Sequence, residues 1–127
     1  MMNNKGQTLV IFVVFLPILI LLIATVIDIS LMYSEANELN NINKLVINYG
    51  LSNIEENNLE NKLEKLSKLN DDNINEVNIK IEKNKIIIIL EKKEKSIFGN
   101  VIGLKEYKIK SKYSGELINN KKVIKKG

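Results

Sequence analysis

The chain begins with an uninterrupted apolar run, and its hydrophobic period changes further along. Residues 7–27 read QTLVIFVVFLPILILLIATVI and contain no charged side chain. Because a helix rises about 1.5 Å per residue, a run of this length covers the roughly 30 Å hydrocarbon core of a bilayer. The pattern therefore predicts a leader over residues 1–6 and a transmembrane helix over residues 7–28.

A cleaved secretory signal peptide is the alternative interpretation of this run. The apolar core of a signal peptide normally has about 7–15 residues and ends at a small-x-small cleavage site. The run in this chain is longer, and the small residue near its end, Ala24, lies in the segment IATV. The comparison favours a membrane span.

The charges that flank the run predict its orientation. Lys5 and the amino terminus precede the run, whereas Asp28, Glu35 and Glu38 follow it, and the next Lys is Lys44. Positive charge stays on the cytoplasmic side of a membrane. We therefore expect a single-pass protein of the cell membrane with a cytoplasmic N-terminus and an extracytoplasmic C-terminal domain.

The predicted span contains one proline and ends at an acidic residue. Pro17 cannot donate a hydrogen bond to the carbonyl of Val13, so a kink is expected there. Proline is common in membrane helices, and a kink could also shape packing between subunits, so both interpretations stay open. Asp28 closes the span at the expected outer surface.

The helical pattern continues beyond the span. Apolar residues recur at spacings of mostly three and four, the period of a helix; they are Ile29, Met32, Tyr33, Ala36, Leu39, Ile42, Leu45, Val46 and Tyr49. We expect one long helix in which residues 29–50 are the extracytoplasmic continuation and Gly50 is a left-handed terminator. The apolar stripe of this outer half needs a covering partner.

A small domain is predicted over residues 51–118. The segment Ser52-Asn53-Ile54-Glu55 fits a capping box that opens a short second helix. Its apolar side includes Leu59, Leu63 and Leu66. The turn cluster over 70–73, Asn-Asp-Asp-Asn, follows it and lacks the glycine of a calcium-binding loop, so no metal site is expected there.

The hydrophobic period then changes to two, which is typical of strands. Val77, Ile79 and Ile81 alternate with polar residues, Lys83-Asn84 forms a tight turn, and residues 85–91 are apolar on both faces, as in a central strand. After a glycine-containing loop over 96–103, a third strand runs over about 104–114. We expect an α+β fold with a three-stranded antiparallel sheet packed on the long helix, and a frayed basic tail over 119–127.

Composition removes several classes of chemistry. The chain has no Cys, His or Trp, which leaves neither a disulfide or thiolate metal site nor a His general base. None of its Ser residues lies in a nucleophile elbow. The sequence therefore predicts a protein that is not an enzyme and needs no cofactor.

Positive charge accumulates at the C-terminal end. From Lys105 onward there are eight Lys and two Glu, so this stretch carries a net charge of +6. Such a stretch attracts phosphate, and binding of extracellular DNA is one hypothesis. The chain has no Arg for bidentate recognition, however, and an anionic cell wall or lipid surface fits the charge as well, so nucleic acid is not an expected partner.

Five positions near the N-terminus resemble a known family. Gly6, Val10, Phe12, Pro17 and Asp28 fall where TadE/TadG-like pseudopilins of the tight-adherence (Flp) pilus system carry a Gly, a Val-Glu-Phe segment, a Pro within an apolar stretch and an acidic residue at its end. The resemblance implies a pilin-like fold and cleavage by a prepilin peptidase between Gly6 and Gln7. It also implies other pilin-like subunits and the pilus assembly machinery as partners.

One position departs from the family pattern. Ile11 stands where the family has an acidic residue, five positions after the glycine. In pilin-like assembly that carboxylate is thought to meet the amino terminus of a neighbouring subunit, so its loss removes a pairing device. The departure favours an accessory subunit over a major polymerising one. An uncleaved single-pass protein with a small binding domain, unrelated to pili, is the alternative hypothesis.

Overall fold

A computed structural model of the chain describes residues 4–99, 103 and 105–127. Within these residues the fold has two helices followed by four strands: α1 (Asn4–Ser52), α2 (Leu59–Asn70), β1 (Ile74–Glu82), β2 (Lys85–Lys95), β3 (Glu106–Ile118) and β4 (Lys121–Lys126). The predicted α+β class, the long N-terminal helix, the short second helix and the antiparallel sheet are confirmed, but the sheet has four strands and not three.

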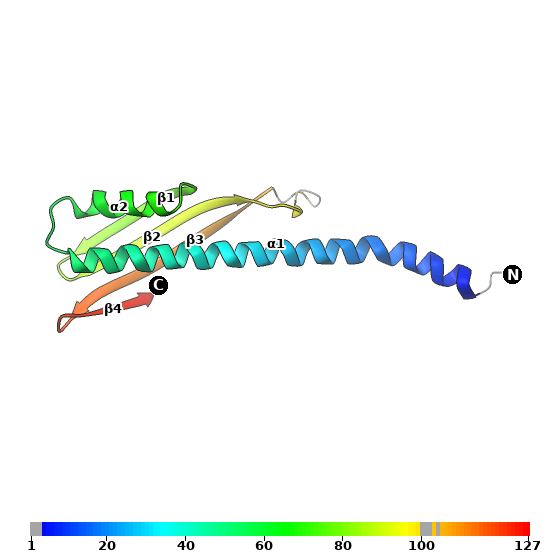
Figure 1. The fold of residues 1–127 in the computed structure, drawn as a ribbon, viewed down its shortest axis with the longest axis horizontal. Coiled ribbons are helices and arrows are strands. Elements are labelled where there is room, and N and C mark those ends of the chain that lie inside the picture. Colours follow the sequence, from blue (N-terminus) through cyan, green and yellow to red (C-terminus); the bar gives the residue numbers. More distant parts are fainter. Residues whose placement is uncertain (1–3, 100–102, 104) are drawn as a thin grey trace.

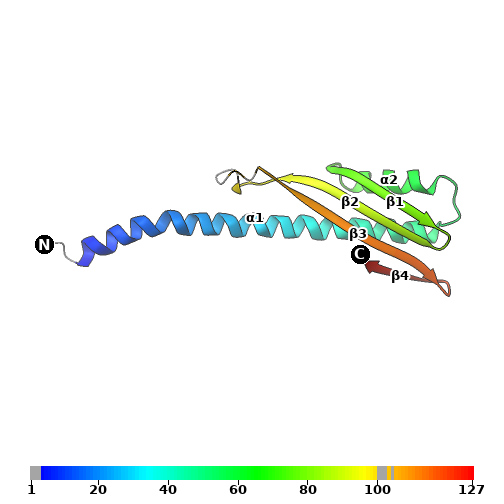
Figure 2. The ribbon, with the colours of Figure 1, turned by 180° about the vertical axis from the view of Figure 1, so that it is seen from behind.

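Helix α1 runs the whole length of the molecule (Figure 1). Its C-terminal half lies beside α2 and the sheet, whereas its N-terminal half projects alone, and the view from behind shows the same arrangement (Figure 2). The 49 residues of the helix continue through Pro17 without a break. The N-terminal part of α1 bends away from the line of the rest in both views.

The expected role of Gly50 as a helix terminator is wrong. Helix α1 continues to Ser52, and Gly50 is buried within it. A Cβ atom at this position would lie 2.6 Å from Ile86 Cδ1 and 3.1 Å from Leu63 Cδ1. The missing side chain therefore lets β2 and α2 approach the helix closely, a packing requirement that resembles a stop signal in the sequence.

The expected capping box at Ser52 is also wrong, because Ser52 ends α1 and helix α2 begins only at Leu59. The residue before α2, Asn58, has a left-handed backbone (φ 58°) and no side-chain cap. Leu59 and Leu63 are buried, as the apolar periodicity predicts, and they anchor α2 on the core. The turn predicted over 70–73 does link α2 to β1.

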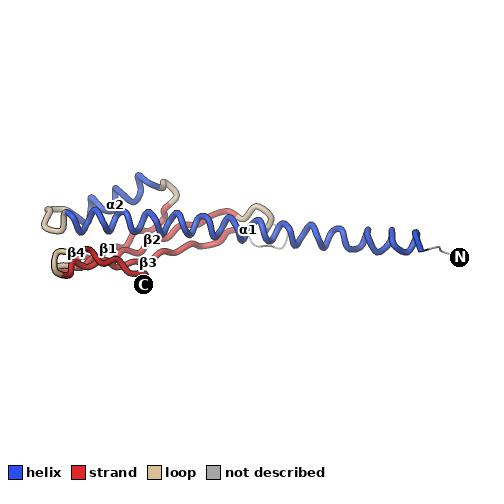
Figure 3. The backbone as a smooth tube through the Cα atoms, turned by 60° about the horizontal axis from the view of Figure 1, so that its bottom comes forward, coloured by secondary structure: helices blue, strands red, loops and turns tan. Residues whose placement is uncertain are grey.

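The sheet is an antiparallel meander in the order β1-β2-β3-β4, with the predicted tight turn at residues 83–84 between β1 and β2. The prediction of a central position for the apolar strand is confirmed, since β2 pairs with both β1 and β3. One face of β2 carries the fully buried Ile86, Ile88 and Leu90. Both helices cover this same face of the sheet, as Figure 3 shows.

The prediction that residues 119–127 are frayed is wrong, because they contain the turn and the whole of β4. Asn119 (φ 53°) and Asn120 (φ 63°) join β3 to β4 as a two-residue hairpin turn in which both residues are left-handed. Asparagine tolerates this conformation better than most residues, and such a turn matches the twist of paired strands. The pair of Asn between Ile118 and Lys121 is the signal that could have predicted the hairpin.

The core lies between the outer half of α1 and the sheet. It consists of Leu39, Ile42, Val46, Ile47, Leu51, Leu59, Leu63, Ile74, Ile86, Ile88, Leu90, Ile109 and Tyr113. Gly115 of β3 brings the sheet closest to the helix, because a Cβ atom there would overlap Ile47 Cγ2 and come within 2.9 Å of Leu51 Cδ1. The stripe on α1 thus has the cover that its pattern requires.

We predict that Gly115→Ala destabilises the protein by about 1–3 kcal/mol, because the added methyl group overpacks the contact with α1. Thermal unfolding of the full chain in detergent measures the effect. Ser114→Ala, one residue away on the opposite face of β3, is the matched control and should change little. Combining Gly115→Ala with Ile47→Ala should cost less than the two single changes added together. Additive costs would show that the two residues do not compete for space.

Candidate functional site

The N-terminal half of α1 is the largest exposed apolar surface that the structure describes. Its large side chains from Leu9 to Ile29 are exposed, and none of the most apolar stretch of the helix is buried. Among the described residues α1 is the one helix long and apolar enough to cross a membrane, and it lies near the N-terminus. A signal sequence meets the same test of length and hydropathy, whereas a buried core helix of a soluble domain does not have this exposure.

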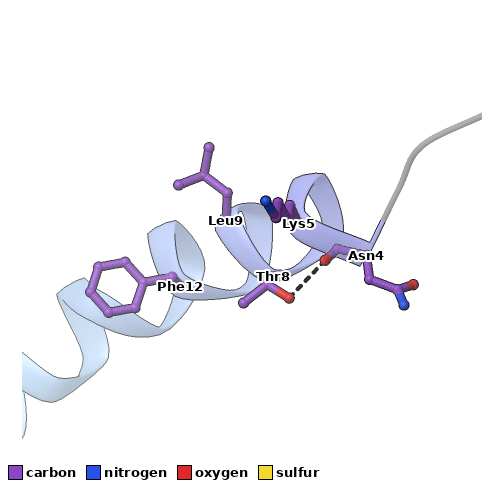
Figure 4. Close-up of a pocket in the computed structure, with 5 residues that line it drawn as sticks. All are labelled: Asn4, Lys5, Thr8, Leu9 and Phe12. Carbon is purple, nitrogen blue, oxygen red and sulfur yellow. Dashed lines mark hydrogen bonds between the residues drawn. The ribbon is translucent and has the colours of Figure 1, made fainter.

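The bond expected to be cut, between Gly6 and Gln7, lies inside the first turns of α1. Figure 4 shows the neighbouring side chains of Asn4, Lys5, Thr8, Leu9 and Phe12 around a shallow pocket. The Thr8 hydroxyl donates a hydrogen bond of 2.7 Å to the carbonyl of Asn4. All five side chains come from this one helix.

Pro17 and Asp28 occupy different surroundings on α1. Pro17 lies on an apolar groove that Val13, Leu16, Ile20, Leu21 and Ala24 also line, together with Phe98 from the segment after β2. Asp28 lies further along the helix and contacts that same segment. The structure therefore brings both residues near the loop between β2 and β3, but it does not bring either near Gly6.

The carboxylate of Asp28 holds the start of the β2–β3 loop. Its Oδ1 accepts a hydrogen bond from the backbone N–H of Ile97 (3.0 Å), and its Oδ2 accepts from the N–H of Phe98 (3.1 Å) and the hydroxyl of Ser96 (2.8 Å). The Ser96 Oγ in turn accepts from the N–H of Gly99 at 2.7 Å. This carboxylate is thus occupied within its own chain, although its sequence pattern marks only the end of the span.

A buried lysine joins three elements next to this loop. The side chain of Lys92 on β2 is 1% exposed, and its Nζ lies 2.5 Å from Glu35 Oε2 on α1, 2.6 Å from Asp71 Oδ2 after α2 and 3.7 Å from Glu94 Oε1. Burial acts to lower the pKa of Lys92, but the hydrogen bonds from Nζ to Asp71 and Glu35 outweigh it and hold the pKa above its usual range. Lys92 is therefore charged at neutral pH.

Asp71 is the best-buried carboxylate partner of that lysine. Its partial burial acts to raise the pKa of the carboxyl group, but the hydrogen bond from Lys92 and one from the N–H of Asn73 hold this pKa below its usual range. The turn over 70–73 thus supplies a carboxylate partner for a buried ammonium group. The burial of Lys92 could have been predicted from the sequence, because Lys92 continues the alternation of Ile86, Ile88 and Leu90 on the helix-facing side of β2.

A third polar contact lies deep in the core. The side-chain amide of Asn43 on α1 is fully buried and donates to the carbonyl of Ile88 (3.0 Å) and to the carbonyl and hydroxyl oxygens of Ser111 (3.2 Å each). These acceptors belong to β2 and β3. The contact fixes how the helix sits across two neighbouring strands, and the helical periodicity gave no indication of it.

The basic residues of β3 alternate with buried residues and occupy the sheet face opposite the helices. Lys108 Nζ and Lys110 Nζ lie 3.2 Å and 3.7 Å from the two carboxylate oxygens of Glu91 on β2. Lys112 pairs in register with Ile89 of the same strand. Part of the positive charge is therefore balanced within the sheet, and this face is not a continuous basic surface.

We predict that Asp28→Ala releases the start of the β2–β3 loop, because three donors lose their acceptor. Hydrogen exchange of the Ile97 and Phe98 amides in detergent should speed up. Asp28→Asn keeps one acceptor oxygen and should have a smaller effect. Unchanged exchange in Asp28→Ala would contradict this role.

We also predict that protonation of Asp71 causes part of the loss of stability in acid. Because the pKa of Asp71 is lower in the folded state, its contribution is present above the unfolded pKa of about 3.9 and is lost as the pH falls through the lower folded value. Asp71→Asn should lower the free energy of unfolding by about 1–3 kcal/mol at pH 7. The variant should then lose less stability than wild type as the pH falls. The free energy of unfolding, measured as a function of pH, tests this prediction, and the exposed Asp72→Asn is the control. An equal loss of stability in acid for wild type and Asp71→Asn would contradict the prediction.

Comparisons with known proteins complete this description. No protein-family model, no characterised protein and no solved structure matches the chain. The function is therefore argued from the residues and geometry described above.

Proposed function

We propose that the chain is a membrane-anchored, pilin-like structural or accessory subunit of a Flp-type pilus or a related secretion pseudopilus. The observation that carries this proposal is the division of α1 into two halves. One continuous helix has an apolar N-terminal half exposed on all sides and a C-terminal half that buries one face against an antiparallel sheet. This combination suits a subunit that is stored in a membrane and later packs helix against helix.

The exposed half needs an apolar environment. Burial of apolar surface contributes about 25 cal/mol per Å², so exposure of more than a dozen large side chains to water is strongly unfavourable. Lipid supplies that environment before assembly, and the helices of neighbouring subunits could supply it afterwards. In this proposal the charges around the span place the N-terminus in the cytoplasm and the domain outside the cell membrane.

Two residues favour an accessory role. Ile11 replaces the acidic residue that the resembling family carries, and it leaves no carboxylate there for a neighbouring amino terminus. Asp28, the acidic residue at the end of the span, is occupied by the loop of its own chain. Neither position offers a charge for pairing between subunits, so we expect incorporation at low copy number or a priming role.

The second candidate is an uncleaved single-pass membrane protein with a small extracytoplasmic domain. It accounts for the exposed apolar half of α1 equally well, and it needs no cleavage of the Gly6–Gln7 bond, which lies within a helix. Genomic neighbourhood discriminates between the two candidates at little cost. Adjacent genes for a secretion ATPase and a prepilin peptidase favour the pilin-like subunit.

The processing step is directly testable by intact mass measurement of the membrane form. Coexpression with an active prepilin peptidase should remove Met1–Gly6 and leave Gln7 as the new amino terminus, whereas a catalytically inactive peptidase should leave the leader. Gly6→Leu is the matched control and should stay uncut, because the added side chain occupies the cleavage position. A membrane form that keeps Met1–Gly6 beside an active peptidase would reject processing and leave the uncleaved anchor.

A further inference from the structure

We propose that the start of the β2–β3 loop, residues 96–99, is a second membrane contact, with Ile97 and Phe98 inserted into the lipid beside α1. The inference rests on the proposed membrane span. It adds a lipid-binding surface on the domain itself, which would hold the domain close to the bilayer instead of on a free stalk. The described residues of the loop carry the argument.

The first observation is the position of Phe98 along α1. The ends of β2 and β3 extend past the rest of the domain towards the free half of the helix (Figures 1 and 2). Phe98 lines two adjacent grooves, one with Leu21 and Asp28 and the other with Val13 and Pro17. Leu21 and Asp28 are seven residues apart, or about 10 Å along the helix. Phe98 thus lies on the membrane side of Asp28, against the apolar span.

The second observation is the polarity of the loop. Ile97 is 58% exposed, and Phe98, which lies against α1, still exposes 39% of its surface. The cost of placing a loop in lipid comes mainly from unpaired backbone groups. Here the N–H groups of Ile97 and Phe98 are bonded to Asp28, and that of Gly99 to Ser96. The loop therefore presents apolar side chains while these polar groups are satisfied internally.

The third observation is the charge at the base of the loop. Lys93, Lys95 and Lys105 are exposed there, and the N–H of Ser96 donates to the carbonyl of Lys105 at 3.1 Å. Glu94 and Glu106 lie at the same level, but Glu94 faces the buried Lys92. Lysines just above an inserted apolar tip can reach lipid phosphates with their charged ends while their methylene stems stay on apolar surface. Lipid is therefore the occupant that fits both the tip and its base.

A protein partner fits the same surface less well. The groove that Phe98 shares with α1 continues directly into the exposed span. Whatever surrounds the span must also surround Phe98, and in the stored, monomeric form that is lipid. The helix of a second copy would occupy this position only after assembly, and the experiment below separates that case.

Depth-dependent fluorescence quenching tests the proposal, because the chain has no Trp of its own. Full-length Phe98→Trp and Ile97→Trp variants are reconstituted at high dilution in bilayers with brominated acyl chains. Phe15→Trp within the span is the positive reference, and Ile118→Trp, an exposed apolar position at the far end of β3, is the negative one. Unfolding curves matched to wild type confirm that each variant folds.

We expect Phe98→Trp and Ile97→Trp to show blue-shifted emission and strong loss of intensity, with bromine near the headgroup end quenching most. The inference would be overturned if Phe15→Trp is strongly quenched but Phe98→Trp and Ile97→Trp are quenched no more than Ile118→Trp. That result would leave the membrane span supported. Blue-shifted emission at positions 97 and 98 without quenching would mean protein cover and would also overturn it. Failure to quench Phe15→Trp would reject the span itself and therefore both proposals.

Discussion

Close approach between α1 and the middle of the sheet is the contact on which the other features depend. Two glycines make it possible, because side chains at Gly50 and Gly115 would collide with residues of β2 or of the helix. Once the helix lies this close, Ile86, Ile88 and Leu90 of β2 are fully buried, and α2 covers the flank towards β1. Among the described residues the helix has no comparable partner over its N-terminal half. The same element therefore packs against protein at one end and exposes an apolar surface at the other.

Three polar contacts set the position of the helix along the sheet. Asn43 binds carbonyl groups of β2 and β3, Glu35 binds the buried Lys92, and Asp28 binds the loop after β2. These α1 residues are eight and seven residues apart, which places them about two turns from one another on one face of the helix. Apolar packing alone tolerates sliding by a turn, whereas buried hydrogen bonds penalise it. The series thereby fixes where the domain lies along α1.

The local pattern of apolar and polar residues predicted most helices and strands. It could not predict contacts between residues that are distant in the sequence. The long helix, the central apolar strand and the faces of β3 follow from periodicity that each residue shows by itself. Gly50 was misread because close packing and helix termination both select glycine. Asp28 was found as the end of an apolar run, but its partners are almost seventy residues away in the sequence. Lys92 is charged on an otherwise apolar face, and this was the one visible indication of the cluster that it forms with Glu35 and Asp71.

The hairpin at Asn119 and Asn120 changes the meaning of the basic tail. By adding β4, it turns Lys121, Lys122, Lys125 and Lys126 into the outer edge of the sheet. A row of lysines on an edge strand repels an identical row and blocks strand-to-strand pairing with another chain. Self-association through this edge of the sheet is thereby discouraged. The positive charge at this end of the chain therefore opposes amyloid-like stacking of strands, a role that requires no ligand.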